Sequence, residues 1–171
     1  MSNVYFTSDW HLGHGYAAEQ RGFADTLSHD ISIMDAIGNT LTKKDHLWVL
    51  GDIAWNPESL QIMDMLDPRI TMKAILGNHD KFDTQVYLKR FSWVGGALKF
   101  KKMWLTHIPV HPQEMFMCAA NVHGHIHQFG STGNLGAPYI NVNWDFWKRP
   151  VSLKEIQAME AGWHDDCPIT T

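Results

Sequence analysis

The stretch ITMKAILGNHD, residues Ile70 to Asp80, joins an apolar run to a glycine and three polar side chains. The run Ile70 to Leu76 predicts a buried β-strand, and Gly77 permits a tight turn at its end. Asn78 offers a neutral amide oxygen, and His79 is free to point into the space beyond the strand. Such clusters at the carboxyl ends of strands are typical of sites in α/β sheets.

The same order of apolar run and polar cluster occurs twice earlier in the chain. The run Val4 to Ser8 leads into Asp9 and His11, and the run His46 to Leu50 leads into Asp52. Asp9 and His11 are two residues apart, so in a continuing strand both would face one side and reach one metal ion. The two oxygens of Asp52 can bridge two ions. The ordinary alternatives are a helix cap or surface turn at Asp9 and an N-cap at Asp52.

Helices are expected between these strands. Residues 26–41 have apolar residues near helical spacing, with Ser28 or Asp30 as possible caps. Asn56 and Pro57 open a second helix, which carries three spaced apolar residues, Leu60, Met63 and Leu66.

A third helix is expected over 82–91, so the first half of the chain alternates strand and helix three times. The second half predicts short strands at 93–94, 97–101, 103–106, 121–123 and 139–143, and a final helix at 152–161. Gly95 and Gly96 resemble a hairpin turn. Residues 109–120 and 130–136 are expected to be loops. We expect one domain over residues 1–171, of the α/β (α+β) class.

Three more histidines follow strands in the second half: His107, His125 and His127. A single histidine at a strand end is more often structural than a ligand, so His107 gains weight only from the other clusters. His125 and His127 occupy alternate positions after Gly124, which is a good metal signal. Asp, Asn and His without Cys suit two borderline divalent ions with open positions for water and substrate.

Composition narrows the class of protein. The 171 residues include 44% hydrophobic and 19% charged residues, as in a globular protein, and the net charge of −4 argues against a mainly electrostatic nucleic-acid binder. Cys118 and Cys167 cannot form a disulfide framework, which favours a reduced cytosolic setting. No segment has the length and apolarity of a bilayer span or a signal core, so we expect a cytoplasmic protein without a membrane partner.

Taken together, the clusters resemble the calcineurin-like metallophosphoesterases. That family's pattern is Asp-x-His, Gly-Asp, Gly-Asn-His-Asp or Glu, His, and Gly-His-x-His, and the match runs from Asp9 to His127. The opening, residues 8–14, and the tail, residues 143–152, also resemble a compact, cap-less branch of predicted phosphoesterases. The resemblance implies a four-layer αββα sandwich of two mixed β-sheets flanked by helices.

The resemblance also implies roles for single residues. Asp9, His11 and His127 would hold one metal ion; the other would be held by Asn78, His107 and His125. Asp52 would bridge both ions, and His79 would act as an acid or phosphate-binding group. Mn²⁺ is the first choice of ion, with Fe, Ni²⁺, Zn²⁺ or Co²⁺ able to bind the same ligands.

The implied activity is hydrolysis of a phosphate ester by a hydroxide that bridges the metals. The short, cap-less chain favours a phosphodiester or nucleotide-type substrate, with nucleic acid only as a substrate. The alternatives are a phosphomonoesterase or protein phosphatase on the same centre, a non-catalytic interaction module with the same fold, and a nuclease subunit of a larger machine.

One position departs from the family pattern. Many relatives have an Asp three residues after the bridging Asp, where it orients the catalytic His, and this chain has Trp55 there. Asp80 is a poor replacement by direction. The candidate substrate contacts are His14, Asn78 and His79. For His14, as for His111 and His123, the first interpretation is a structural role or support behind ligands, and a substrate contact is the second. Asp145 could form a wall of the cleft with Trp144 and Trp147, although aromatic residues this dense are more often core.

Overall fold

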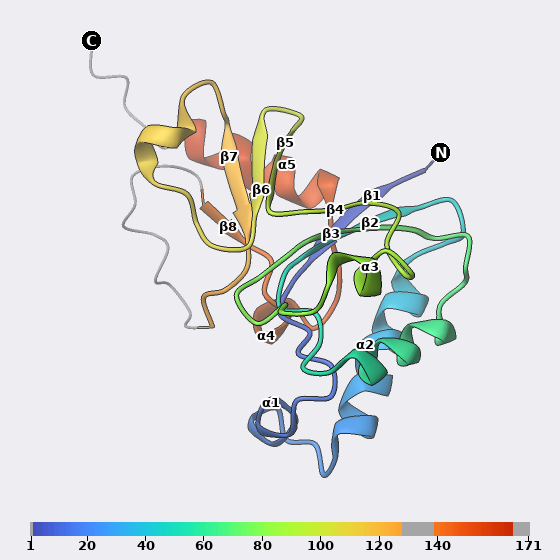
Figure 1. Cartoon of the computed structure of the whole chain (residues 1–171). Helices are drawn as coiled ribbons and strands as arrows, with labels where there is room; N and C mark the ends of the chain where they lie inside the picture. Colours follow the sequence, from blue (N-terminus) through green and yellow to red (C-terminus); the bar gives the residue numbers. More distant parts are fainter. Residues whose placement is uncertain (1, 128–138, 166–171) are drawn as a thin grey trace.

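Two sheets make up the centre of the molecule (Figure 1). The computed structural model describes residues 2–127 and 139–165, with side chains as far as residue 161, so the expected loop at 130–136 and Cys167 lie outside it. The first sheet has the strand order β4-β3-β2-β1-β9. Its strands are β1 (Val4–Thr7), β2 (His46–Leu50), β3 (Thr71–Ile75), β4 (Val94–Gly95) and β9 (Val151–Ser152). All neighbours are parallel except β9, which runs antiparallel to β1.

The second sheet has the order β5-β6-β7-β8. Its strands are β5 (Ala97–Phe100), β6 (Met103–Thr106), β7 (Ala120–His123) and β8 (Tyr139–Asn141). Here β5 and β6 are antiparallel, and β6, β7 and β8 are parallel. Both sheets are therefore mixed, as predicted.

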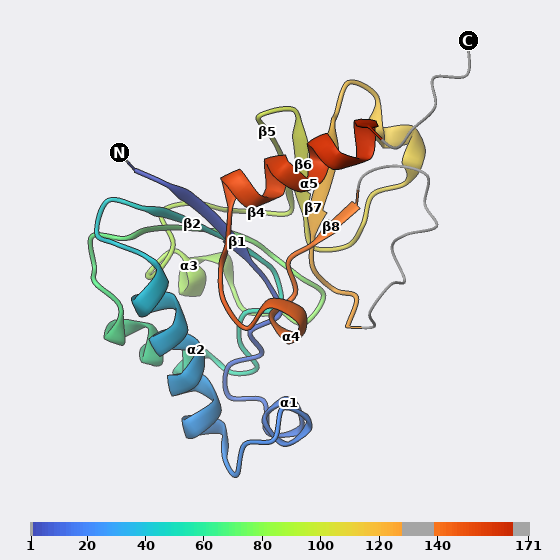
Figure 2. The same ribbon diagram turned by 180° about the vertical axis from the view of Figure 1, so that it is seen from behind.

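The helices flank the sheets (Figures 1 and 2). The α-helices are α1 (Gly15–Gln20), α2 (Thr26–Thr40), α3 (Thr84–Tyr87), α4 (Trp144–Trp147) and α5 (Leu153–Asp165). The 3₁₀ helices are η1 (Pro57–Met65) and η2 (Pro112–Met115). Among the described residues, no helix combines the length and apolarity that a membrane span needs.

Alternation along the strands sends side chains into two separate apolar clusters. In β2, Leu47 and Val49 join a cluster with α2, while Trp48 and Leu50 join a second cluster. The second cluster lies between the sheets, because it also contains residues of β6, β7 and β8. Since side chains alternate between the faces of a strand, β2 is buried on both sides. The predicted sandwich of two mixed sheets flanked by helices is confirmed.

The hairpin prediction at Gly95 and Gly96 is wrong. Gly95 pairs with β3 in the first sheet, and β5 begins the second sheet at Ala97, so these glycines lie where the chain crosses between sheets. The hairpin is instead closed by Lys101 and Lys102, whose φ angles are 47° and 62°. Two successive left-handed residues match the twist of a two-residue β-hairpin.

Helix starts and types also differ from the expectation. Asp25, and not Ser28 or Asp30, caps α2, and its carboxylate accepts a 2.7 Å hydrogen bond from the Ser28 amide. Asn56 caps η1 as predicted. That element is a 3₁₀ helix, and the buried Leu60 and Met63, followed by Leu66 at its C-cap, have the three-residue spacing of such a helix.

Two other expected elements are present in altered form. The helix at 82–91 is reduced to the single turn of α3. The final helix begins with a capping box, in which the Glu155 amide donates to the Ser152 hydroxyl and the Ser152 amide donates to the Glu155 carboxylate.

Candidate metal centre

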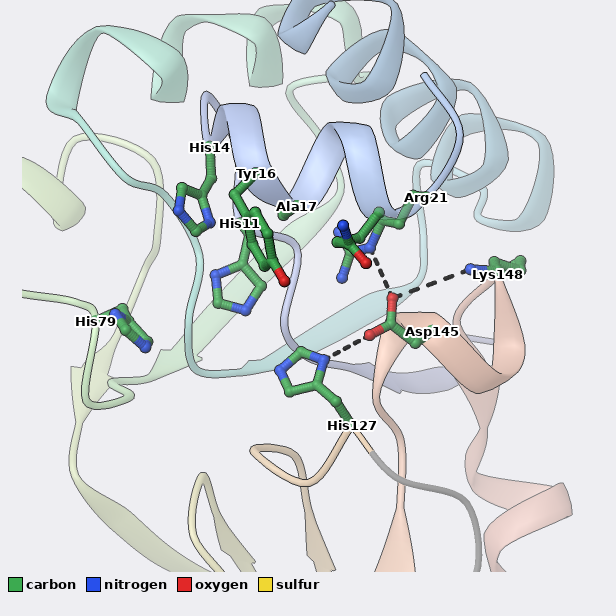
Figure 3. A pocket seen from close by; sticks show the side chains of 10 residues that line it. His11, His14, Tyr16, Ala17, Arg21, His79, His127, Asp145 and Lys148 are labelled. Atoms are coloured by element: carbon green, nitrogen blue, oxygen red, sulfur yellow. Dashed lines mark hydrogen bonds and ion pairs between the residues drawn. The ribbon is translucent and has the colours of Figure 1, made fainter. Parts of the chain in front are cut away.

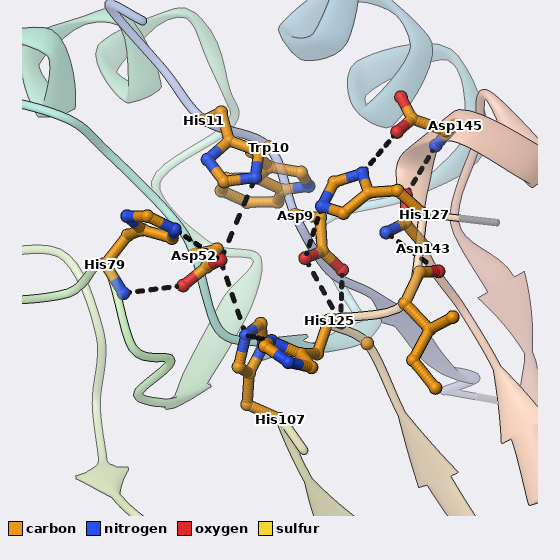
Figure 4. A network of polar contacts seen from close by, with 12 residues as sticks. Asp9, Trp10, His11, Asp52, His79, His107, His125, His127, Asn143 and Asp145 are labelled. Carbon is orange, nitrogen blue, oxygen red and sulfur yellow. Dashed lines mark hydrogen bonds and ion pairs between the residues drawn. The ribbon is translucent and has the colours of Figure 1, made fainter. Parts of the chain in front are cut away.

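Every predicted metal-binding residue lies just beyond the end of a strand. Figure 4 labels all of them except Asn78. Strands β1, β2 and β3 are parallel, so their carboxyl ends share one edge of the first sheet; β6 and β7 do the same in the second. The strand ends deliver, in chain order, Asp9 and His11, Asp52, Asn78 and His79, His107, and His125 and His127. Segments from all five motifs therefore meet in one region.

The expectation that Asp9 and His11 continue a strand is wrong. Strand β1 ends at Thr7, and both residues have left-handed backbones, with φ angles of 58° and 52°. Asp52 and His125 share this conformation, at 53° and 69°. Such a backbone costs a non-glycine residue about 1 kcal/mol, so it is concentrated where the surrounding structure enforces it. Four of the seven proposed ligands are held in this way.

Three of the proposed ligands form one tight group, which we call the second ligand set: Asn78, His107 and His125. The Asn78 Oδ1 atom lies 3.0 Å from His107 Nε2 and 2.9 Å from His125 Nδ1, and the two ring nitrogens are 3.3 Å apart. Ligand atoms on one ion with bonds of about 2.1 Å lie roughly 3.0–3.4 Å apart. The donor atoms of this set thus have the spacing of a coordination shell.

The remaining three, Asp9, His11 and His127, form the first ligand set. Each offers a ligand atom within 4.8 Å of the other two, and His127 Nε2 lies 3.5 Å from Asp9 Oδ1. Carboxylate and imidazole together suit borderline divalent cations. Asp9 is fully buried, while the His127 side chain is 41% exposed, so this set opens toward solvent on the His127 side.

Asp52 stands between the two sets (Figure 4). Its Oδ2 atom lies 3.8 Å from His11 Nε2 and 3.4 Å from His107 Nε2. Its Oδ1 atom accepts a 2.9 Å hydrogen bond from the His79 amide. A carboxylate with one oxygen facing a histidine of each set is placed as a bridge between two ions would be.

The two buried carboxylates differ in charge environment. Burial raises the pKa of Asp9 to about 6, because the nearby histidines only partly compensate the loss of water. Burial opposes ionisation of Asp52 as well, but hydrogen bonding and charge from His107 outweigh it and lower the pKa of Asp52 to about 2. A cation beside Asp9 would supply the missing compensation, so the residues present fit a metal ion there.

Asp145 braces His127 from the side away from Asp9 (Figure 4). Its Nδ1 atom lies 2.5 Å from Asp145 Oδ2, and this hydrogen bond raises the pKa of His127. Asp145 in turn accepts a 2.6 Å hydrogen bond from Arg21 Nε. With Nδ1 donating to the carboxylate, the Nε2 lone pair faces Asp9, which is the tautomer that a metal ligand needs.

Arg21 ties this brace to the backbone of the first motif. Its guanidinium donates to the carbonyl oxygens of Asp9 and Trp10, both at 2.8 Å, and lies 2.9 Å from His29 Nε2. The Arg21 side chain is only 6% exposed. A buried guanidinium with this many partners fixes the loop that carries Asp9 and His11.

The second ligand set is braced by backbone instead. His107 Nδ1 donates to the carbonyl oxygen of Leu50 at 2.8 Å, which leaves Nε2 facing Asn78. The His125 amide donates to both carboxylate oxygens of Asp9, at 3.2 and 3.0 Å. Burial works against a charge on His107, but the Asp52 and Asp9 carboxylates raise its pKa overall.

Two motif glycines are required by close approach. A Cβ atom on Gly77 would lie 2.3 Å from Asp52 Oδ1, and one on Gly124 would lie 2.5 Å from Asp9 Oδ2. Any side chain at either position would displace a proposed ligand.

The ring of His79 accepts or donates no side-chain hydrogen bond to a carboxylate within the described part of the chain. Its Nε2 atom makes a long ion-pair contact with Asp52 at 4.0 Å, and its Nδ1 atom is buried without a hydrogen-bond partner among the described residues. The Trp55 and His11 rings flank it at centroid distances of 5.5 and 5.6 Å. Asp80 accepts hydrogen bonds from the amides of Asp52, Ile53 and Gly77, so it supports the loops and does not orient the His79 ring, as the sequence indicated.

Two cavities adjoin the centre. One of about 550 Å³ is lined by His11, His79 and His127, and one of about 370 Å³ by Asn78 and His107; no residue lines both. His14, a candidate substrate contact, lines the larger cavity and stacks on Trp55 at 3.9 Å. The candidate substrate contacts His14 and His79 thus face one cavity, and Asn78 faces the other.

The other singled-out residues make local contacts. His111 caps η2 by accepting from the Gln113 amide, and His123 is buried with its Nδ1 donating to the Gly124 carbonyl. Trp144 is core, and Trp147 packs against the cluster between the sheets.

Arg21 and Asp145 were not recognised as supports of the centre from the sequence. Neither lies in one of the five motifs, and their pairing spans 124 positions along the chain. The sequence suggested Asp145 only as a possible wall of the cleft, in a tail with its own family resemblance, and Asp145 does line the larger cavity.

Comparisons with known proteins bear on the family and the fold of this chain. The family model of the calcineurin-like phosphoesterase superfamily domain matches residues 3–142. The Gene 66 protein of Mycobacterium phage D29 is 28% identical over 93% of this chain and 96% of its own length. The Gene 66 protein of Mycobacterium phage L5 is 40% identical over 47% of this chain and 41% of its own. A crystal structure of a protein of unknown function, AQ665 from Aquifex aeolicus, superposes with a TM-score of 0.74 and 23% identity over 93% of this chain and all of that chain, which supports the fold.

Proposed function

This chain belongs to the calcineurin-like phosphoesterase superfamily, and on that premise we propose that it hydrolyses phosphate esters at a centre of two divalent metal ions. The proposed ligands are Asp9, His11 and His127 for one ion and Asn78, His107 and His125 for the other. Asp52 is the proposed bridge.

The position of Asp52 carries the proposal. One of its oxygens faces His11 at 3.8 Å and His107 at 3.4 Å, so a single carboxylate serves both ligand sets. A purely structural carboxylate would need only hydrogen-bond donors. Asp52 has such a donor, the His79 amide, at its Oδ1 atom, and this leaves Oδ2 facing the two histidines.

Two bound divalent ions would lower the pKa of a water molecule and neutralise the phosphate oxygens. The chain's own residues then have separate tasks. Asn78 adds no charge to the centre, which leaves it more cationic toward a phosphate. His79 borders the larger cavity beside Asp52, where its ring can donate a proton or a hydrogen bond to the leaving oxygen.

We favour a phosphodiester or nucleotide-type substrate over a monoester. Residues of the first ligand set line a cavity of about 550 Å³, and residues of the second line another of about 370 Å³. A diester has two substituents on phosphorus, and we propose that each cavity takes one of them, whereas a monoester would use only one.

Mn²⁺ is the proposed ion, because carboxylate, amide and imidazole ligands without thiolate suit it; Fe, Ni²⁺, Zn²⁺ and Co²⁺ suit the same set. A cytoplasmic location remains a prediction, which fractionation of the source cells would test.

The test combines metal analysis with paired substrates. Purified protein is loaded with Mn²⁺, its metal content is measured by elemental analysis, and hydrolysis of bis(4-nitrophenyl) phosphate is compared with that of 4-nitrophenyl phosphate. We expect about two ions per chain and faster turnover of the diester. Faster turnover of the monoester would favour the phosphomonoesterase alternative, and bound metal without turnover of either would favour a non-catalytic module.

A further inference from the structure

The larger cavity beside the first ligand set contains two side chains that the proposed chemistry does not use (Figure 3). Tyr16 comes from α1 and Lys148 from the end of α4, and both line the cavity together with His11, His79 and His127. At about 550 Å³ the cavity has the size of a small-molecule site, and it begins at the proposed metal ligands.

Tyr16 lines this cavity and is 65% exposed, although it lies on a helix whose Ala18 is buried. Its ring is 6.4 Å from that of His14, at an interplanar angle of 53°, so the two rings do not stack on each other. An exposed aromatic ring in the cavity wall is therefore open to stacking with a planar group on a ligand.

Lys148 brings a positive charge to the cavity. Its ammonium group is 4.0 Å from Asp145, whose carboxylate is already held at 2.6 Å by Arg21 and at 2.5 Å by His127. Asp145 thus has closer partners than Lys148, and the lysine side chain is 59% exposed.

The backbone of Lys148 adds a second, independent observation. Its φ is 52°, so it occupies the left-handed position after a helix, where glycine would be free of strain. Lys148, which lines the cavity, therefore occupies a backbone position that costs a non-glycine residue strain.

We propose that this cavity binds the organic part of the substrate, and that this part carries a planar ring and a further negative charge. The ring stacks on Tyr16 and the charge pairs with Lys148. This inference rests on the proposed function and adds to it the class of ester and two specificity-determining residues.

Three probes that differ by one feature test the inference without turnover. AMP adds a planar base to ribose 5-phosphate, and ADP adds a second phosphate to AMP. The binding of each to Mn²⁺-loaded protein is measured by isothermal titration calorimetry at fixed free Mn²⁺. We expect AMP to bind about tenfold more tightly than ribose 5-phosphate, as stacking of one base on an aromatic side chain implies. ADP should bind several-fold more tightly than AMP.

Each substitution should remove one of these preferences and leave the other. Tyr16→Leu should abolish the preference for AMP over ribose 5-phosphate, and Lys148→Gln should reduce that for ADP over AMP. Lys148→Gly should reduce the same preference while raising Tm, because it also relieves the left-handed strain. Phe116→Leu and Lys44→Gln, both exposed outside the cavity, are the matched controls.

The outcomes are separable from those of the proposed function. The cavity assignment would be overturned if the parent protein and all variants had the same affinity ratios, of AMP to ribose 5-phosphate and of ADP to AMP. If hydrolysis of bis(4-nitrophenyl) phosphate were intact at the same time, the phosphoesterase proposal would stand. A parent protein that neither retains metal nor hydrolyses any ester would overturn the proposed function, and this inference with it.

Discussion

The two ligand sets of the centre are held in different ways. The second set depends on the sheets themselves, because His107 donates to the carbonyl oxygen of Leu50 at the end of β2. The first set depends on an ion-pair network, in which Asp145 and Arg21 hold His127 and the Asp9 loop. Regular structure therefore pre-forms one half of the centre, and two charged residues outside the motifs complete the other.

Asp52→Asn should affect both ligand sets, however each is held, because Asp52 faces a histidine of each set. We expect the metal content to fall from two ions to less than one, and turnover to fall by roughly 10³-fold, since several kcal/mol of charge stabilisation are lost. Elemental analysis and a diesterase assay on the same sample measure both. Near-normal activity with two ions bound would contradict the bridging role.

His79→Ala should leave both sets intact and affect only the chemistry. We expect full metal content, a loss of about 10²-fold on alkyl phosphate esters, and a loss of less than about tenfold on 4-nitrophenyl esters, whose leaving groups need no acid. Parallel assays of the two ester classes make the comparison. Equal losses on both would count against His79 as the acid.

In metal-free protein, substitution of Asn for each of the two buried carboxylates should change the free energy of unfolding in opposite directions. The pKa of Asp9 is raised from 3.8 to about 6, so the folded state binds this proton more tightly and stability falls as the pH rises between those values. Asp9→Asn, which tolerates the left-handed backbone, should add on the order of 2 kcal/mol to the free energy of unfolding at about pH 7.5.

The pKa of Asp52 is lowered to about 2, so its ionised form stabilises the fold above pH 3.8, and this contribution is lost as the pH falls toward 2. Asp52→Asn should therefore lower the free energy of unfolding at about pH 7.5. Urea unfolding of metal-stripped protein at about pH 7.5 and pH 4 measures both, and the gain from Asp9→Asn should largely vanish at the lower pH. A loss of stability in both variants would refute the contrast.

Loss of the Arg21 side chain, which braces the first ligand set, should weaken metal binding at that set alone. Arg21→Met is expected to weaken the binding of one Mn²⁺ ion by roughly 10–100-fold and to leave the other unchanged, as for other residues that orient metal ligands. Mn²⁺ titration followed by electron paramagnetic resonance resolves the two affinities. Arg90→Met, which breaks an exposed ion pair with Asp64, is the matched control. Equal weakening of both ions would mean that the brace serves the whole centre.

The sequence was informative where regular structure sets the geometry. Buried strands end in polar clusters, and parallel neighbours align those ends, so the apolar runs indicated that Asp52, Asn78 and His107 each lie at the carboxyl end of a strand. The meeting of the two sheet edges at one site came from the family resemblance. The three-residue spacing of the apolar residues in η1 predicted a helix but did not distinguish its observed 3₁₀ form from an α-helix.

The rest depends on contacts between distant segments. Asp9 and His11 reach their positions through left-handed backbones fixed by hydrogen bonds to the chain after β2, which no local pattern reports. The crossing at Gly95 and Gly96 looked like a hairpin because two glycines between short strands are common to both. The Arg21–Asp145 pair joins helices that were not predicted at all.

The antiparallel pairing of β9 with β1 has a consequence for biosynthesis. It places a late strand of the fold beside the first one, and α4 with Asp145 lies shortly before that strand. Asp145 is made 124 positions after its partner Arg21. During translation the residues of the second ligand set, which end at His125, can therefore come together before the support of the first ligand set exists.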